Sequence, residues 1–201
     1  MRPVIVSNIV SLDGFYADAA GNAPFAGMDR AFDAYNLERL EQATTVLLGR
    51  QTFAGFSSYW PRIAEAPSDP DDRALDPTNR GISRRYAAVP KVVVSDDLVL
   101  ADAHPWASST TVVSGRDVAA WLHHARLEGL GEIVIFGSRL LWNSLVLQGL
   151  VDEVHLMVAP VVLGAGTPAF IAGPGLNLLA VRQFPGSDNV VLRYGVEKVN
   201  D

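Results

Sequence analysis

Short apolar runs rich in β-branched residues recur along the chain, separated by stretches with helical spacing or by glycine and proline. Runs of this length and composition are typical of buried β-strands. We therefore expect strands at Pro3–Val10, Thr45–Leu48, Lys91–Ser95, Thr110–Ser114, Glu132–Phe136, Glu153–Ala159 and Val190–Val199. Helical patterns lie between several of these runs, and the alternation predicts an α/β protein.

Helices are expected at Asp29–Gln42, Asp117–Glu128 and Ser138–Gln148. Each lies between two strands, as the helices that connect parallel strands do. The last two strands follow each other without a helix, across a segment at 172–189 rich in glycine, proline and asparagine, which predicts antiparallel pairing. The sequence thus predicts one domain over residues 1–201, with a mixed central sheet flanked by helices.

Residues 61–80 interrupt this pattern, because they are rich in proline and aspartate and poor in large apolar side chains. We expect a mobile loop there. A lid over a binding site and a plain surface insertion are both consistent with this composition.

The composition of the chain excludes several kinds of functional site. The 201 residues include no cysteine and carry a formal charge of −6. Disulfides, cysteine-bound zinc and thiol nucleophiles are therefore excluded. The absence of a Lys/Arg block argues against nucleic-acid or anionic-membrane binding, which requires clustered cations. The first ten residues are too short and too polar for a signal peptide or membrane span, so we expect a cytoplasmic protein.

The strongest candidate site begins where the strand Thr45–Leu48 runs into Gly49-Arg50-Gln51-Thr52. A glycine at this point lets the backbone approach a ligand, and the following residues offer amide groups, a guanidinium and a hydroxyl to an anion. The alternative is that Arg50 forms an ordinary surface salt bridge.

Other polar residues occur at predicted strand ends, where open α/β sheets bind ligands. They are Ser95, Gly115, the pair Gly137-Ser138 with Ser138 as the expected N-cap of a helix, and the glycines of Leu163–Pro168. Each also has a structural interpretation, as a turn, a cap or a β-bulge. The six-position glycine spacing of a Rossmann domain does not occur.

Two aspartates are candidates for catalysis. Asp13 follows the first strand, where it either caps a turn or faces a ligand. Asp33 lies among Phe32, Tyr35 and Leu37 on a predicted helix, where it faces either a ligand or solvent. The four histidines form no recognisable metal site or catalytic triad, and we expect no metal.

The order of these motifs resembles the dihydrofolate reductase-like superfamily, and within it the riboflavin-biosynthesis reductases similar to the RibD C-terminal domain. The motifs are Ser11-Leu12-Asp13-Gly14, Leu47–Phe53, Pro90–Ser95, Phe136-Gly137-Ser138, Val151-Asp152-Glu153 and Pro160–Gly166. The resemblance extends from the first strand to the last.

The resemblance implies a three-layer fold, commonly a homodimer, that binds NADPH across the strand ends. It implies an enzyme that transfers a hydride to a C=N or C=O group of a pteridine- or pyrimidine-like heterocycle. The cofactor-binding residues implied by position are Gly49, Arg50, Thr52, Ser95, Gly115, Gly137, Ser138, Arg139 and Leu140. Asp33 would orient or protonate the heterocycle, and Asp13 is a second candidate.

The sequence departs from the family at Asp96, where many relatives carry an arginine. A carboxylate there would repel a 2′-phosphate and leaves NADH as an alternative cofactor. Because the 201 residues include no cysteine, we expect no zinc deaminase half like that of the bifunctional riboflavin enzyme among them. Two other functions remain open: a dinucleotide-binding module without turnover, and a genuine dihydrofolate reductase. The segment from Leu150-Val151 to Leu156-Met157 is a candidate dimer face.

Overall fold

The structure, a computed structural model, describes residues 1–23, 27–67 and 69–197. The chain forms two units, each assembled from segments distant in sequence. Unit 1 comprises Met1–Arg2 and Asp33–Ser138, and unit 2 comprises Pro3–Phe32 and Arg139–Asp201. Because neither unit is continuous, a boundary cannot be recognised from composition along the chain. The expectation of a single domain remains a prediction.

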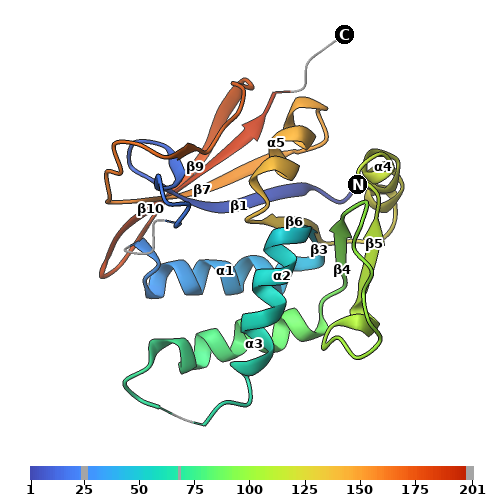
Figure 1. The fold of residues 1–201 in the computed structure, drawn as a ribbon. Coiled ribbons are helices and arrows are strands. Elements are labelled where there is room, and N and C mark those ends of the chain that lie inside the picture. The colour runs from blue at the N-terminus through green and yellow to red at the C-terminus, as the bar shows by residue number, and fades with distance from the viewer. Residues whose placement is uncertain (24–26, 68, 198–201) are drawn as a thin grey trace. The chain divides into compact units, whose positions relative to one another are not determined.

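Unit 1 is built on parallel strands in the order β5-β4-β3-β6. Their bounds are β3 Ala43–Gly49, β4 Lys91–Val94, β5 Thr110–Val113 and β6 Glu132–Phe136. The connection from β3 to β4 contains α2 (Arg50–Tyr59), η2 (Trp60–Arg62), η3 (Arg73–Leu75) and α3 (Pro77–Ala88). The turn η4 (Ala107–Ser109) precedes β5, and α4 (Val118–Leu127) leads from β5 to β6 (Figure 1).

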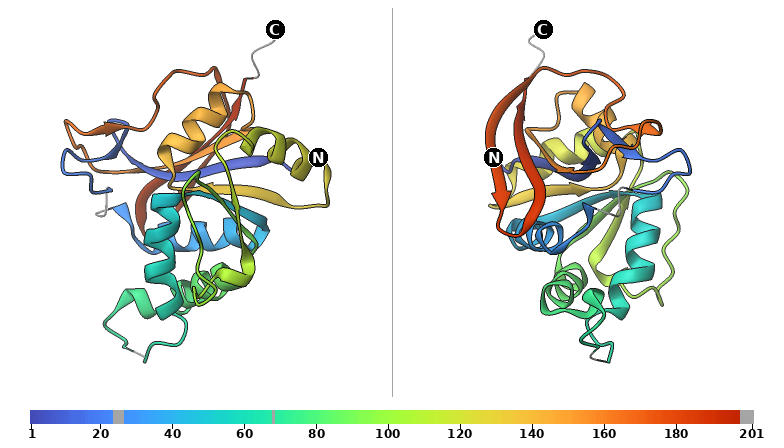
Figure 2. Two further views of the ribbon diagram at one scale, coloured as in Figure 1. Left: turned by 45° about the vertical axis from the view of Figure 1, so that its right-hand side comes forward. Right: turned by 90° about the vertical axis from the view of Figure 1, so that its left-hand side faces the viewer.

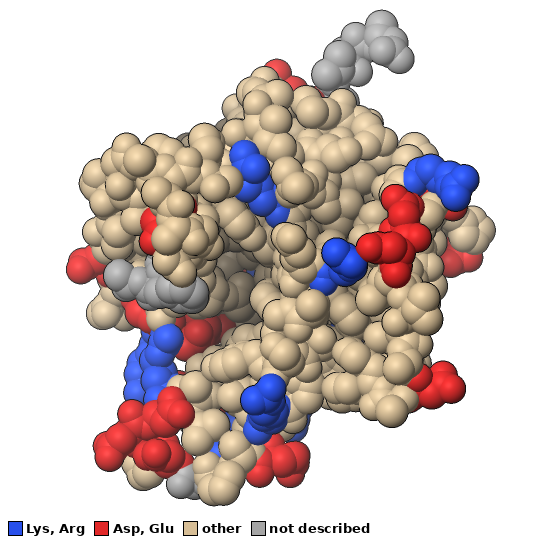
Figure 3. All heavy atoms as spheres, in the orientation of Figure 1, with Lys and Arg blue, Asp and Glu red and all other residues tan. Residues whose placement is uncertain are grey.

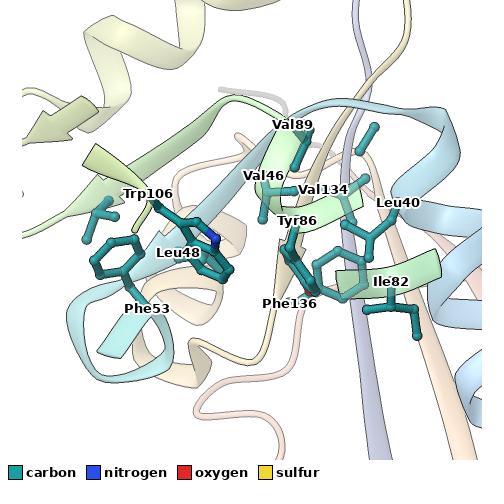
Figure 4. Close-up of a cluster of buried hydrophobic side chains, with 12 residues drawn as sticks. Leu40, Val46, Leu48, Phe53, Ile82, Tyr86, Val89, Trp106, Val134 and Phe136 are labelled. Atoms are coloured by element: carbon teal, nitrogen blue, oxygen red, sulfur yellow. The ribbon is translucent and has the colours of Figure 1, made fainter. Parts of the chain in front are cut away.

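The hydrophobic core of unit 1 packs α2 and α3 against the parallel strands. Phe53 from α2, Ile82 and Tyr86 from α3, and Trp106 meet the strand residues (Figure 4). The Tyr86 ring stacks on Trp106 with centroids 5.8 Å apart. Burying a side chain the size of Phe53 stabilises a fold by about 1.5–3 kcal/mol. This packing fixes the position of α2, whose first residue follows β3 directly.

Unit 2 combines parallel and antiparallel pairing. Its strands are β1 (Val4–Ser11), β7 (Glu153–Ala159), β10 (Ser187–Val196) and β9 (Leu176–Phe184). β1 pairs with β7 in parallel, whereas β10 pairs antiparallel with both β7 and β9. The short strands β2 (Phe15–Ala17) and β8 (Thr167–Pro168) form a separate antiparallel pair. The right-hand view of Figure 2 shows β9 and β10 side by side as a long ribbon.

Two helices remain. α5 (Arg139–Leu147) belongs to unit 2, and α1 (Arg30–Gln42) begins in unit 2 and continues into unit 1. These helices, α4 and the seven predicted strands all lie where the sequence predicts them, within a few residues at their ends. The mixed α/β class and the antiparallel C-terminal strands are confirmed. The last two residues of the predicted strand Val190–Val199 lie outside the described residues.

The prediction of an irregular loop over 61–80 is wrong in part. Its second half contains η3, and α3 begins at Pro77. Asp76 is the N-cap of α3, because its side chain accepts a hydrogen bond from the Asn79 amide at 2.9 Å. Proline at the first helical position after an aspartate cap is a recognised helix start. Ser68 lies outside the described residues.

The segment at 172–189 was expected to be only a connection, and this is also wrong. It contains β9, whose side chains are exposed or half-buried along its whole length. An edge strand of this kind lacks the continuous apolar run of a central strand.

The helix α2 was also missed, because the sequence predicted only a turn after Gly49.

No helix in the described part of the chain combines the length and apolar character that a membrane crossing requires. On the face drawn in Figure 3, the basic side chains lie scattered among acidic and uncharged ones.

Candidate functional site

The ends of the parallel strands of unit 1 bring most of the predicted cofactor-binding residues together. Gly49 on β3 pairs in register with Val94 on β4, and Val94 with Val113 on β5. On the other side of β3, Leu47 pairs with Ile135 of β6. Continuing this register by two residues places Gly137 beside Gly49. In parallel strands these carboxyl ends meet at one edge of the sheet.

We call this edge the strand-end site. It comprises the segments that leave the four strands, with the predicted residues Gly49, Arg50, Thr52, Ser95, Gly115, Gly137 and Ser138. All of these residues belong to unit 1.

The amino terminus of α2 lies in the middle of this site. Gly49 is the N-cap residue, and no side chain caps the helix. The first amide groups of an α-helix have no partner within the helix, and the helix dipole adds partial positive charge there. An uncapped terminus followed by Arg50 therefore has the chemistry that binds a phosphate or pyrophosphate.

The turn after β6 is attached to α2 by two hydrogen bonds. The Gly49 amide donates to Ser138 Oγ at 2.9 Å, and the Ser138 amide donates to Thr52 Oγ1 at 2.9 Å. Gly137 and Ser138 both adopt left-handed backbone conformations, with φ of 54° and 51°. The serine conformation is unfavourable for a residue with a Cβ atom. The two hydrogen bonds hold Ser138 in it.

Ser95 and Arg50 both contact the same carboxylate. Arg50 Nη1 lies 2.8 Å from Asp97 Oδ2 in an exposed ion pair. The Ser95 hydroxyl donates to Asp97 Oδ1 at 2.8 Å, and its oxygen accepts from the Leu98 amide at 3.1 Å. The structure thus places Arg50 in a surface salt bridge, which was the alternative left open by the sequence.

The turn after β5 has a matching arrangement. The Gly115 amide donates to Asp96 Oδ1 at 2.9 Å. The Ser114 hydroxyl donates to Asp117 Oδ2 at 2.6 Å. Three carboxylates therefore lie on the turns that follow β4 and β5.

Asp33 belongs to a different cluster. It is 5 % exposed and its Oδ2 accepts from Arg73 Nη1 at 2.9 Å and from Asn79 Nδ2 at 3.0 Å. Burial raises the pKa of Tyr59, with smaller contributions from Asp72 and Asp33. The two partners of Asp33 follow α2 in the chain, because Arg73 belongs to η3 and Asn79 to α3.

Asp13, in unit 2, anchors a loop. Its carboxylate accepts from the Ser11 hydroxyl at 2.6 Å and from the Leu163 and Gly164 amides at 3.1 and 2.7 Å. The hydrogen bond from Ser11 and those from the two amides lower the pKa of Asp13 to about 2. At neutral pH this carboxylate is ionised, so it can accept hydrogen bonds but holds no proton to donate.

Comparisons with known proteins agree with this architecture. Residues 2–186 match the family described as RibD C-terminal domain. The chain belongs to the RibD C-terminal domain family. It is 27 % identical over 191 residues to the uncharacterized protein YyaP of Bacillus subtilis (strain 168), covering 94 % of this chain and 92 % of that protein.

Solved structures place this RibD C-terminal domain among dihydrofolate reductase-like folds. One is the diaminohydroxyphosphoribosylaminopyrimidine deaminase/5-amino-6-(5-phosphoribosylamino)uracil reductase of Thermotoga maritima, with a TM-score of 0.62 and 15 % identity. The match covers 97 % of this chain but 57 % of that one. Another is the dihydrofolate reductase of Enterococcus faecalis, solved with NADP(H) and RAB-propyl, with a TM-score of 0.60, 14 % identity and 96 % coverage of both chains. The predicted fold and family are thus confirmed.

The two remaining predicted cofactor residues lie at the start of α5 in unit 2. Arg139 donates a hydrogen bond from Nε to the carbonyl oxygen of Pro168, and the Leu140 side chain is exposed. Their roles, like those of the other predicted site residues, remain predictions. Within the described ranges, no group of three or more His, Asp or Glu side chains could hold a metal ion.

Sequence reasoning missed Asp97, Arg73 and Asn79, which are the direct partners of Arg50, Ser95 and Asp33. Arg73 and Asn79 lie 40 and 46 residues from Asp33. A side-chain contact across such a separation leaves no periodic signal. Asp97 had a local signal, because Ser95-Asp96-Asp97 is a sequence that forms a side-chain-capped turn.

The family's dinucleotide fits part of the strand-end site. The uncapped terminus of α2 suits a pyrophosphate, and Gly49 leaves room beside it, since a Cβ atom there would meet only the Ser138 side chain, with Oγ at 3.7 Å and Cβ at 3.8 Å. These residues would hold the pyrophosphate.

Proposed function

We propose that this RibD C-terminal domain protein is a nicotinamide-dependent reductase. It transfers a hydride from NADPH or NADH to a C=N or C=O group of a pteridine- or pyrimidine-like heterocycle. The observation that carries the proposal is the alignment of the uncapped α2 terminus with the turns after β4, β5 and β6 at one sheet edge. Ligands of open α/β sheets bind at this edge.

The residues of unit 1 supply binding and orientation in this proposal. The first amides of α2 hold the pyrophosphate, and Arg50, which stays paired with Asp97, lies at the start of the same helix. Ser138 and Thr52 keep the turn after β6 in place through their two hydrogen bonds. The bound nicotinamide supplies the hydride, and the protein supplies position and electrostatics.

Asp33 is the residue proposed to orient the acceptor. Amino-substituted pyrimidine and pteridine rings carry adjacent N–H donors, which a carboxylate accepts well. Asp33 presently accepts from Arg73 and Asn79, which are donors of the same kind. Because Asp33 is only 5 % exposed, an acceptor reaches its carboxylate only if a covering side chain, for which we propose Arg73, moves away.

The test is a titration of the protein with NADPH and with NADH, followed by the thermal midpoint and tryptophan fluorescence. A ligand that binds only the folded state raises its stability, by about 2.7 kcal/mol at a hundred times the dissociation constant. We expect at least one dinucleotide to raise the midpoint. If saturating concentrations of both leave it unchanged, the proposed function is refuted.

A second function, a dinucleotide-binding module without turnover, is favoured by one observation. The salt bridge from Arg73 and the hydrogen bond from Asn79 both occupy Asp33 Oδ2, an oxygen of the carboxylate proposed to hold the acceptor. Oxidation of bound reduced dinucleotide by dihydrofolate, diaminopyrimidine or flavin-type acceptors separates the two functions. Stoichiometric oxidation by any acceptor removes the second function, and rapid antifolate-sensitive turnover of dihydrofolate would indicate a genuine dihydrofolate reductase.

We also propose that the protein is a homodimer, although not through the face expected from the sequence. Val151 and Met157 of that face are buried inside the chain. The apolar side chains left exposed include Leu178, Leu179 and Val181 on β9, the last strand in the order of unit 2. Exposed apolar edges of this kind favour pairing between chains. Light scattering after size exclusion measures the mass, and a monomer at micromolar concentration would contradict the proposal.

A further inference from the structure

The strand-end site fits a pyrophosphate but not the additional phosphate of NADPH. We infer that it selects a dinucleotide whose adenosine ribose carries free hydroxyl groups, which is NADH, and that Asp96 and Asp97 make this selection. The inference rests on the proposed function, because it concerns the same site. It differs from the cofactor with which the Enterococcus faecalis fold relative was solved.

The first step concerns hydrogen-bond donors. A phosphomonoester needs several donors, which usually come from guanidinium, hydroxyl and backbone amide groups. Donors of these kinds near the turns after β4 and β5 include Arg50, Ser95, Ser114 and the Gly115 amide. Each already donates to a carboxylate: Arg50 and Ser95 to Asp97, Ser114 to Asp117, and Gly115 to Asp96. The protein itself fills these four donors with negative groups, and the exposed Arg116 on the turn after β5 is a further guanidinium.

The second step concerns charge. Asp96, Asp97 and Asp117 on these turns outnumber the two neighbouring arginines, Arg50 and Arg116, and Arg50 is bound to Asp97. The Arg50–Asp97 pair is exposed, with side-chain accessibilities of 54 % and 67 %, so the pair itself is weak and Arg50 could turn toward a phosphate. That movement would leave Asp97 without its cation beside an incoming dianion. The Asp97 carboxylate and the phosphate would then repel each other, so Arg50 would add little to the affinity for NADPH.

The third step concerns what the carboxylates accept. The hydroxyl groups of a ribose are donors, and an acidic residue that accepts from the 2′-hydroxyl is the usual mark of NAD sites, whereas arginine accompanies the 2′-phosphate in NADP sites. Asp96 and Asp97 keep acceptor capacity, because an ionised carboxylate has about four lone-pair positions. The 2′-hydroxyl of NADH can donate a hydrogen bond to the carboxylate oxygens of Asp96 and Asp97. The 2′-phosphate of NADPH would present only acceptor oxygens to the same carboxylates.

The experiment measures dissociation constants of NADH and NADPH by isothermal titration for the wild-type protein and for Asp96→Asn, Asp97→Asn and the double variant. Asp102→Asn removes the same charge from an exposed residue that precedes η4, and serves as the matched control. We expect wild type to bind NADH at least about tenfold more tightly than NADPH. The double variant should reduce or reverse this preference for NADH over NADPH, and the control variant should keep the wild-type preference.

A second measurement needs no variant. ADP-ribose and 2′-phospho-ADP-ribose differ only by the phosphate in question, and wild type should bind the first more tightly. A preference that grows as salt is lowered would agree with repulsion between charges.

The outcomes are distinct. If neither dinucleotide binds the wild-type protein, the proposed function itself fails. If NADPH binds as tightly as NADH, or more tightly, the function stands and the selection by Asp96 and Asp97 is refuted. An unchanged ratio in folded Asn variants would equally refute the assignment to these two residues.

Discussion

The Ser138 hydroxyl oxygen lies 2.9 Å from the Gly49 amide nitrogen, so a side chain on the turn after β6 accepts a hydrogen bond from the N-cap residue of α2. The same serine has a left-handed backbone with φ of 51°. The hydrogen bond raises the free energy of unfolding, whereas the strained backbone conformation lowers it. A pair of substitutions can separate the two terms.

Ser138→Ala should remove the hydrogen bond and keep the strain, which lowers the free energy of unfolding by about 1–2 kcal/mol. Ser138→Gly removes the hydrogen bond but also relieves a left-handed strain of about 1 kcal/mol. The glycine variant should therefore be more stable than the alanine variant. Urea denaturation measures both, and an alanine variant as stable as wild type would show that the hydroxyl contributes nothing.

The contact between Asp33 and Arg73 gives a test of the proposed acceptor site. Asp33→Asn removes the charged acceptor of the buried Asn79 side chain and of Arg73, whose side chain is 42 % exposed, and should cost about 1–3 kcal/mol of stability. It should lower turnover of the acceptor while leaving the dissociation constant of the dinucleotide unchanged. Steady-state kinetics and dinucleotide titration measure the two effects separately.

Arg73→Gln distinguishes a displaceable partner from a purely structural one. If Arg73 competes with the acceptor for Asp33, its removal should lower the KM of the acceptor. A raised KM, with the dinucleotide still bound, would contradict competition and favour a structural role for the salt bridge.

Lys91 provides a pH-dependent prediction. It is 1 % exposed, and its ammonium group donates to the Tyr86 and Val89 carbonyl oxygens at 2.6 and 2.7 Å. Burial lowers the pKa of Lys91 from 10.5 to about 8. Between these two values the unfolded chain binds a proton that the folded chain does not, so the free energy of unfolding rises with pH in this window.

The slope is at most about 1.4 kcal/mol per pH unit. Comparison with Lys91→Met isolates the contribution of Lys91 to this slope. The tyrosines titrate in both proteins, so their contribution cancels in the difference. The stability of wild type minus that of the variant should increase between pH 8 and 10. A constant difference over this range would show that the pKa of Lys91 in the folded protein is not lowered.

The cap of α3 is a further test. Asp76 accepts from the Asn79 amide, and Asp76→Ala should destabilise the protein by about 0.5–2 kcal/mol. Asp71→Ala changes an exposed aspartate of the same segment and is the control. Since Asn79 also donates to Asp33, the cap variant should in addition lower acceptor turnover. Equal stability of the two variants would contradict the role of Asp76 as a cap.

Much of the fold could be predicted because the central strands are continuous apolar runs. Residues Val46–Leu48 and Ile133–Phe136 are buried on both faces, and such runs are recognisable without a partner. β9 could not be recognised in this way because most of its side chains are exposed. The helix α2 contains Gly55, Ser57 and Ser58, which have low helix propensity. Its apolar spacing at Phe53, Phe56 and Trp60 was the signal that could have revealed it.

The candidate site was predictable to a different extent. Glycines and hydroxyls at strand ends, such as Gly49 and Ser95, follow from local sequence. Their partners do not, because each partner depends on which strands are neighbours. Ser138 meets Gly49 only because β6 lies beside β3, although 89 residues separate them.

The division of the chain into interleaved units also has a consequence for synthesis on the ribosome. β1 is made long before its parallel partner β7, which begins at Glu153, so residues 33–138 are all translated before these two strands can pair. All eight residues of β1 are buried in the finished structure. A nascent chain must therefore keep an apolar strand from aggregating before β7 is available to pair with it. Pairing across such a sequence separation is slow, so we expect the sheet of unit 2 to be completed after the core of unit 1.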